Sequence, residues 1–195
     1  MIDSNNFFIL SLPLFIFIFL LNLVIHKKKG KQYTFFRYIL LFSLGLYFLL
    51  LVSVTLFPIF LPHELSVFQR NLRINYIPFK SIISDIHTIG SRSFSLSFEI
   101  KLLVMNIGGN ILLLLPLGLL LPILWTNLRN LKKIFLIGLF TSLSIEILQL
   151  IENILYLGFR SVDIDDVIFN VIGIILGYSL FKVLHTSKNK FQLCK

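Results

Sequence analysis

Five long apolar runs constrain this chain more than any other feature of its sequence. They cover about residues 7–25, 36–57, 104–124, 134–152 and 166–184. A helix needs about 20 predominantly apolar residues to cross the hydrocarbon core of a bilayer, and each run is close to that length. In lipid, only helices and closed barrels satisfy all of their own backbone hydrogen bonds. The runs therefore predict an all-α integral membrane protein with five transmembrane helices.

The composition excludes a soluble globular domain. Of the 195 residues, 56% are hydrophobic and 14% are charged, whereas a soluble domain carries about 25% charged residues. A soluble domain of this size cannot bury so much apolar surface. The single cysteine, Cys194, excludes an internal disulfide.

The basic residues are divided unevenly between the two sides of the predicted membrane. One side carries twelve of the 18 Lys and Arg residues and no acid, and the other carries all nine acids. The twelve basic residues are Lys27, Lys28, Lys29, Lys31, Arg37, Arg129, Lys132, Lys133, Lys182, Lys188, Lys190 and Lys195. Because Lys and Arg are enriched on the cytoplasmic side of membrane proteins, we expect the N-terminus outside and the C-terminus in the cytoplasm.

The same charge pattern decides between two classes of partner. A formal net charge of +9 is compatible with a nucleic-acid binder, but the chain has no basic and aromatic motif of that kind. The basic residues are better explained as topology signals that also favour anionic lipid. We therefore expect a multi-pass protein of the plasma membrane whose partner is the lipid bilayer, with no nucleic acid. The sequence is also compatible with a homo-oligomer.

The chain divides into three parts by the content of its apolar runs. Residues 1–69 are expected to form two scaffold helices without ionisable residues in their cores, and residues 70–184 to form three helices that carry polar side chains. Residues 185–195 form a basic cytoplasmic tail. The first run is expected to be a retained anchor and not a signal peptide, because Asp3 precedes it and a lysine cluster follows it.

The segment between the second and third helices contains one further predicted element. Ile82, Ile86 and Ile89 recur at helical spacing, with Ser84, Asp85 and Thr88 on the opposite face. This pattern predicts a short amphipathic helix at the membrane interface. Residues 91–98 alternate Ser with Phe, Leu or Arg, and we expect an interfacial loop there, because an isolated strand would lack a partner for its backbone.

Costly polar residues lie at one end of each of the last three helices, and the topology places all of those ends outside. The pairs are Asn106 and Asn110, Glu146 and Gln149, and Asp166 and Asn170. Spacings of three and four put each pair on one helix face. A lone charge at mid-bilayer depth costs roughly 2.5–3.5 kcal/mol, so Glu146 is expected to face protein or water, or to be protonated. These six side chains are expected to line one outward-open pocket, with Arg73 and Arg160 the nearest cations.

Structural explanations compete with the pocket. Asp163 and Asp165 stand where helix N-caps are common, and the three Asn residues can join helices by hydrogen bonds. Gly173 and Gly177 have the spacing with which small residues let two helices approach closely. A divalent cation at Asp163, Asp165 and Asp166 has weak support, and no other metal or cofactor is expected.

Four groups of residues, in this order, resemble a known family. They are Asn75-Tyr76-Ile77-Pro78-Phe79, then Asn106 to Asn110 with Pro116-x-Gly118, then Glu146-x-x-Gln149, then Arg160-x-x-Asp163-x-x-Asp166-x-x-x-Asn170-x-x-Gly173-x-x-x-Gly177. Over about residues 70–180 the chain is similar to the VanZ-like family of small bacterial membrane proteins, with Tyr76 where the family is expected to have Leu or a similar residue. The resemblance implies a link to resistance against teicoplanin and related glycopeptides that carry lipid tails.

Two functions from different classes remain in view. The first is a binding module whose outward pocket holds a lipid-linked polar molecule, such as a cell-wall precursor or a lipoglycopeptide. Its ligand-binding residues would be Arg73, Asn75, Asn106, Asn110, Glu146, Gln149, Arg160, Asp163, Asp166 and Asn170. The second is a membrane enzyme that acts on a cell-envelope lipid, with Glu146 or Asp166 as the general acid or base. Transport and a purely structural polar layer rank behind both.

Overall fold

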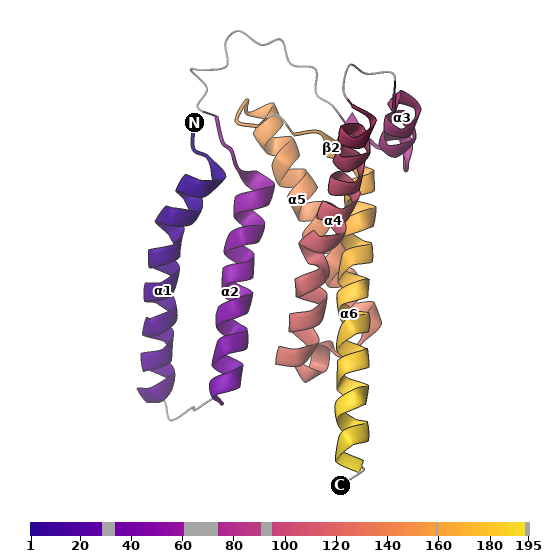
Figure 1. The fold of residues 1–195 in the computed structure, drawn as a ribbon. Helices are drawn as coiled ribbons and strands as arrows, with labels where there is room; N and C mark the ends of the chain where they lie inside the picture. Colours follow the sequence, from indigo (N-terminus) through magenta and orange to yellow (C-terminus); the bar gives the residue numbers. More distant parts are fainter. Residues whose placement is uncertain (29–33, 61–73, 91–94, 159, 194–195) are drawn as a thin grey trace. The chain divides into compact units, whose positions relative to one another are not determined.

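The computed structural model describes residues 1–28, 34–60, 74–90, 95–158 and 160–193 (Figure 1). The chain forms two compact units. The first unit contains Met1–Arg70 and Ile151–Phe159, and the second contains Asn71–Leu150 and Arg160–Lys195.

Among the described residues, five helices are long and apolar enough to cross a membrane. They are α1 (Ser4–Lys28), α2 (Phe35–Leu56), α4 (Leu96–Leu124), α5 (Leu131–Ile154) and α6 (Ile164–Leu193). The three-residue 3-10 turn η2 (Thr126–Leu128) connects α4 to α5. The five predicted spans are thus confirmed, and the chain is a multi-pass membrane protein.

In the first unit, α1 and α2 pair through aromatic side chains. The ring of Phe15 lies 5.3 Å from that of Phe42, centroid to centroid, and it packs directly over the backbone of Gly45. The Ser53 hydroxyl donates a hydrogen bond to the carbonyl of Ser4 (3.0 Å). The most apolar stretch of α1 contains no buried residue, as expected for a helix that faces lipid.

In the second unit, α4 and α6 pack backbone to backbone through glycines, and Figure 1 shows them running alongside each other. A Cβ atom added at Gly173 would lie 2.0 Å from the carbonyl oxygen of Ile111, and one at Gly177 would lie 2.0 Å from that of Leu115. The predicted close approach of Gly173 and Gly177 to another helix is therefore confirmed. On α4, Gly118 meets the carbonyl of Ile174 in the same way.

Gly108 and Gly109, which lie between Asn106 and Asn110, are also small enough to predict a close helix approach, and that prediction is wrong. No described atom lies within 4 Å of a Cβ built at either position. The contact between α4 and α6 lies further towards the C-terminus of α4, where Leu114 and Leu117 are buried. The glycines of α6 face this part of α4.

The helix α4 begins at Leu96, eight residues before the start predicted from hydropathy, so the expected loop is wrong over residues 96–98. Ser95 precedes the helix with extended backbone angles (φ −67°, ψ 143°). A helix satisfies its own backbone hydrogen bonds where the chain meets lipid, which a loop cannot do. The extra turns place Glu99 within α4, and it is buried there.

The segment before α4 contains a short helix and a strand. The helix α3 (Lys80–Thr88) confirms the short helix that the spacing of Ile82, Ile86 and Ile89 predicted. Strand β1 (Ile74–Asn75) pairs in parallel with β2 (Val162–Asp163), with Asn75 opposite Asp163. Sequence patterns did not predict this pair, which consists of two residues per strand.

The two faces of α3 have different surroundings. The side chains of Ile83 and Ile86 are each 52% exposed, whereas Asp85 and Thr88 line a pocket shared with α4. The helix thus exposes Ile83 and Ile86, whereas Ile89, which belongs to the predicted apolar face, lines the same pocket. The position of α3 at the membrane interface stays a prediction.

Substitution of Gly173 by Ala is expected to destabilise the protein by about 1–3 kcal/mol, because the added methyl group would overlap the Ile111 carbonyl and force α4 and α6 apart. Thermal unfolding in detergent micelles measures the effect. The matched control is Gly109→Ala, whose methyl group meets no described atom within 4 Å. Equal stability of the two variants would contradict the glycine-mediated contact.

The charge pattern also gives a prediction about topology. Cys194 is the only cysteine of the chain, so a membrane-impermeant maleimide should fail to label intact cells and should label them after permeabilisation. A variant that combines Cys194→Ser with Asn5→Cys should label in intact cells. Labelling of the native cysteine from outside would reverse the predicted orientation.

Candidate functional site

The carboxylate of Asp163 is the most heavily bonded group at the start of α6. It accepts hydrogen bonds from the backbone N–H of Asp165 (2.9 Å), from the Asn75 amide (2.9 Å) and from the Ser81 hydroxyl. The bond from Asp165 satisfies an N–H that the first turn of a helix leaves unpaired. Asp163 is thus the N-cap of α6, and the prediction that one of these aspartates caps the helix is confirmed.

The segment from Asn75 to Phe79 is fixed to this helix start. The Asn75 amide nitrogen also reaches the Ser81 hydroxyl (2.9 Å), and its oxygen accepts from the N–H of Ile77 (3.2 Å). Phe79 has left-handed backbone angles (φ 63°), and its N–H donates to the Asp165 carboxylate. The residues before α3 are therefore attached to α6 by both side-chain and backbone hydrogen bonds.

Two further carboxylates connect the three long helices of this unit. Glu146, on α5, is only 6% exposed, and its Oε2 accepts a hydrogen bond from the N–H of Asp163 (3.0 Å). Asp166, on α6, accepts a hydrogen bond from the Asn110 amide of α4. We call Glu146, Asp163, Asp165 and Asp166 the acidic layer.

The remaining predicted site residues take different positions. Asn170 is 1% exposed, and its amide donates to the Ser142 hydroxyl of α5 (2.9 Å), about one helical turn beyond Asp166. Gln149 is buried on α5. Arg160 is exposed, and its charge acts on both Glu146 and Asp166. Arg73 lies outside the described residues.

The structure therefore brings together only part of the predicted set. Asn75, Glu146 and Asp163 share one network of hydrogen bonds with Ser81 and Asp165. Asn110 and Asp166 form a separate hydrogen-bonded pair. Asn106 contributes instead to a second group of polar residues.

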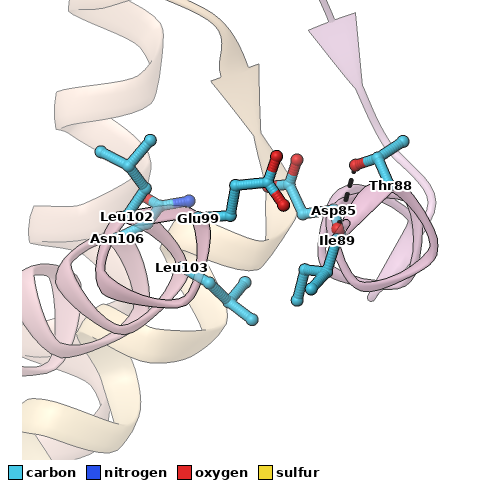
Figure 2. Close-up of a pocket in the computed structure, with 7 residues that line it drawn as sticks. All are labelled: Asp85, Thr88, Ile89, Glu99, Leu102, Leu103 and Asn106. Carbon is cyan, nitrogen blue, oxygen red and sulfur yellow. Dashed lines mark hydrogen bonds between the residues drawn. The ribbon is translucent and has the colours of Figure 1, made fainter. Parts of the chain in front are cut away.

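That second group surrounds a pocket of about 200 Å³ between α3 and α4 (Figure 2). Its lining residues are Asp85, Thr88, Ile89, Glu99, Leu102, Leu103 and Asn106. Glu99 is 5% exposed, and its Oε2 accepts a hydrogen bond from the N–H of Gly90 (2.6 Å). The predictions from sequence missed the pocket because they began the third spanning helix at about residue 104 and so left Glu99 outside it. Helical spacing was the available signal, since Glu99 precedes Asn106 by seven residues and so lies on the same face of one helix.

The acidic layer suits the binding of positive charge or of hydrogen-bond donors. The donors identified above for its carboxylates are all neutral: backbone N–H groups, two amides and one hydroxyl. The buried Asp165 Oδ2 and Asn170 Oδ1 atoms accept no hydrogen bond from the described part of the chain. Within that part, no three His, Cys, Asp or Glu side chains are grouped so that they could hold a metal ion.

Comparison with known proteins identifies one similarity. Residues 44–185 match a protein-family model described as VanZ/LLP1. The match covers most of the chain and begins within α2, so it extends further towards the N-terminus than the motifs of residues 70–180. No curated protein and no solved structure matched the chain.

A double-mutant cycle tests the attachment of β1 to α6. Asn75→Ala and Asp163→Ala remove the two ends of one hydrogen bond, so their effects on the free energy of unfolding should be coupled by about 0.5–3 kcal/mol. Thermal unfolding of the single and double variants gives the coupling. Asn75→Ala combined with Asn170→Ala, a pair without a shared hydrogen bond, should be additive. Additivity of the first pair would contradict the network.

Proposed function

Because this chain belongs to the VanZ/LLP1 family, we propose that it binds the polar head of a lipid-linked molecule at the acidic layer. The ligand class is a cell-wall precursor or a lipoglycopeptide of the teicoplanin type, and the binding contributes to resistance against such antibiotics. The resemblance of the family motifs suggests the antibiotic class, and the chemistry of the acidic layer suggests the mode of binding.

The observation that carries this proposal is the concentration of carboxylates among neutral donors. The acidic layer holds four carboxyl groups, of which Glu146, Asp163 and Asp165 are less than 9% exposed. Burial of a carboxylate is unfavourable unless its charge is balanced or its hydrogen bonds are complete. A headgroup that brings ammonium, amide or hydroxyl donors would add hydrogen bonds to these carboxyl groups, including one to the Asp165 Oδ2 atom, which accepts none from the described residues.

The depth of the layer suits an amphiphilic ligand. Glu146 lies eight residues before the end of α5, which is about 12 Å along a helix axis. The layer would therefore be reached from the membrane interface by a headgroup whose lipid tail stays in the bilayer. The charge pattern predicts that this end of the helices faces outside, where wall precursors and lipidated antibiotics are found.

Arg160 gives the site a second kind of contact. It is exposed, and its charge acts on Glu146 and Asp166. A guanidinium group at this position would bind a phosphate of the ligand through paired hydrogen bonds, while the carboxylates bind the donor groups. Arg73 is predicted from sequence to assist it.

A second candidate function is an enzyme that acts on an envelope lipid. It is favoured by one observation, which is that Glu146 and Asp166 influence each other electrostatically within the same layer. Neighbouring carboxyl groups can divide the roles of general acid and general base. Candidate lipids incubated with the purified protein and analysed by mass spectrometry would be chemically altered in this case, and would stay intact if the protein only binds them.

Binding measurements on the full-length protein in lipid nanodiscs test the proposal, with teicoplanin and a pyrophosphate-linked wall precursor as probes. Glu146→Gln keeps an acceptor for the Asp163 N–H but removes the charge, and Arg160→Ala removes the guanidinium. Each should weaken binding by about tenfold or more, as expected for hydrogen bonds to charged groups.

Two matched variants serve as controls in that experiment. Glu152→Gln makes the same chemical change further along α5, and Lys132→Ala removes a positive charge at the other end of the same helix. Both should bind as the native protein does. Native affinity in folded Glu146→Gln and Arg160→Ala proteins would refute the site.

A further inference from the structure

The pocket between α3 and α4 contains a carboxyl group whose hydrogen bonding is incomplete. Glu99 is 5% exposed and lines the pocket, and its Oε1 accepts no hydrogen bond from the described residues. Its Oε2 accepts a hydrogen bond from the N–H of Gly90, a residue with a positive φ of 80° that lies two residues after the end of α3. The side chain is therefore fixed in place with one oxygen left over, and a buried acceptor of this kind is costly without a partner.

A second carboxylate faces the same space. Figure 2 shows the carboxyl ends of Glu99 and Asp85 turned towards the gap between the two helices. A hydrogen-bond donor in this space would give the Oε1 atom of Glu99 the partner that the described residues do not supply.

The size and the remaining lining of the pocket indicate the kind of donor. Pockets for drug-sized ligands measure about 300–1,000 Å³, so a volume of about 200 Å³ suits a small group or one end of a larger molecule. Ile89, Leu102 and Leu103 supply aliphatic walls, while Asn106 supplies an amide. The lining contains two carboxyl groups, and the described residues offer no group of three His, Cys, Asp or Glu side chains that could hold a metal ion.

We propose that this pocket binds a primary ammonium group carried on a short aliphatic chain. The ammonium group donates hydrogen bonds to Glu99 and Asp85, and its methylene groups pack against the leucine and isoleucine side chains. An ammonium ion has three donors and no acceptor, so it complements two carboxylates and an amide oxygen. The two sources of this chemistry are the headgroup of an amine-bearing lipid and a free or peptide amine.

The position of the pocket makes both sources accessible. Glu99 lies in the first turn of α4, and α3 exposes Ile83 and Ile86 as an interfacial helix does. The pocket therefore lies at headgroup level. None of its lining residues belongs to the acidic layer, so this proposal does not depend on the proposed function.

Titration of the full-length protein with n-butylammonium, followed by saturation-transfer NMR, tests the proposal. The protein is held in nanodiscs of phosphatidylglycerol, a lipid without an amine, and 1-butanol is the neutral comparison. The amine should bind at least tenfold more tightly than the alcohol. Glu99→Gln and Asp85→Asn should each weaken amine binding by about tenfold, and Asp3→Asn, which removes one carboxylate elsewhere, should leave it unchanged. Thermal unfolding of each variant verifies that it is folded.

Several results would overturn the proposal. These are equal binding of amine and alcohol, full amine binding in both folded pocket variants, and saturation by Ca²⁺ or Mg²⁺ without amine binding.

A second arm distinguishes the two sources of the amine. In nanodiscs that contain phosphatidylethanolamine, a lipid headgroup in the pocket should compete with butylammonium and weaken its apparent binding by severalfold. Unchanged butylammonium binding there identifies a free or peptide amine as the ligand.

Discussion

The carboxylate of Asp163 is the group on which the rest of the polar structure depends. It caps α6, holds the amide of Asn75 and accepts the Ser81 hydroxyl, while its own N–H donates to Glu146. Within a membrane protein such a cap has added importance, because the unpaired N–H groups at a helix start cannot all be satisfied by water. One residue thereby connects α6 with α5 and with the segment that leads to α3.

The contact between α4 and α6 determines where the polar side chains meet. Gly173 and Gly177 allow the backbone of α6 to touch the backbone of α4 at Ile111 and Leu115. Apolar side chains gain little from one another in lipid, so close backbone packing is a main source of helix association there. The same contact brings Asp166 to Asn110, just beyond the glycines.

The sequence predicted a large part of the candidate site, and the omissions have physical causes. Glu146 and Asp166 stand out because charged residues are rare inside apolar runs. Asn75 and Asp163 belong to motifs, but the parallel pairing that joins them links residues 88 positions apart, and strands of two residues leave no periodic signal. Glu99 was missed because the apolar run that marks the third span begins only at about residue 104, whereas the membrane boundary favours a longer helix that satisfies its own backbone.

By itself, the sequence determined the five spans, the short helix α3 and the exclusion of a soluble fold, because the length of an apolar run and its period are local properties. Only the tertiary structure decided which donor each carboxyl group received. The N–H that satisfies Glu146 belongs to a backbone position of β2, and every residue except proline offers the same N–H. The choice of partner therefore rests on how the chain is placed in space, and side-chain identity alone cannot specify it.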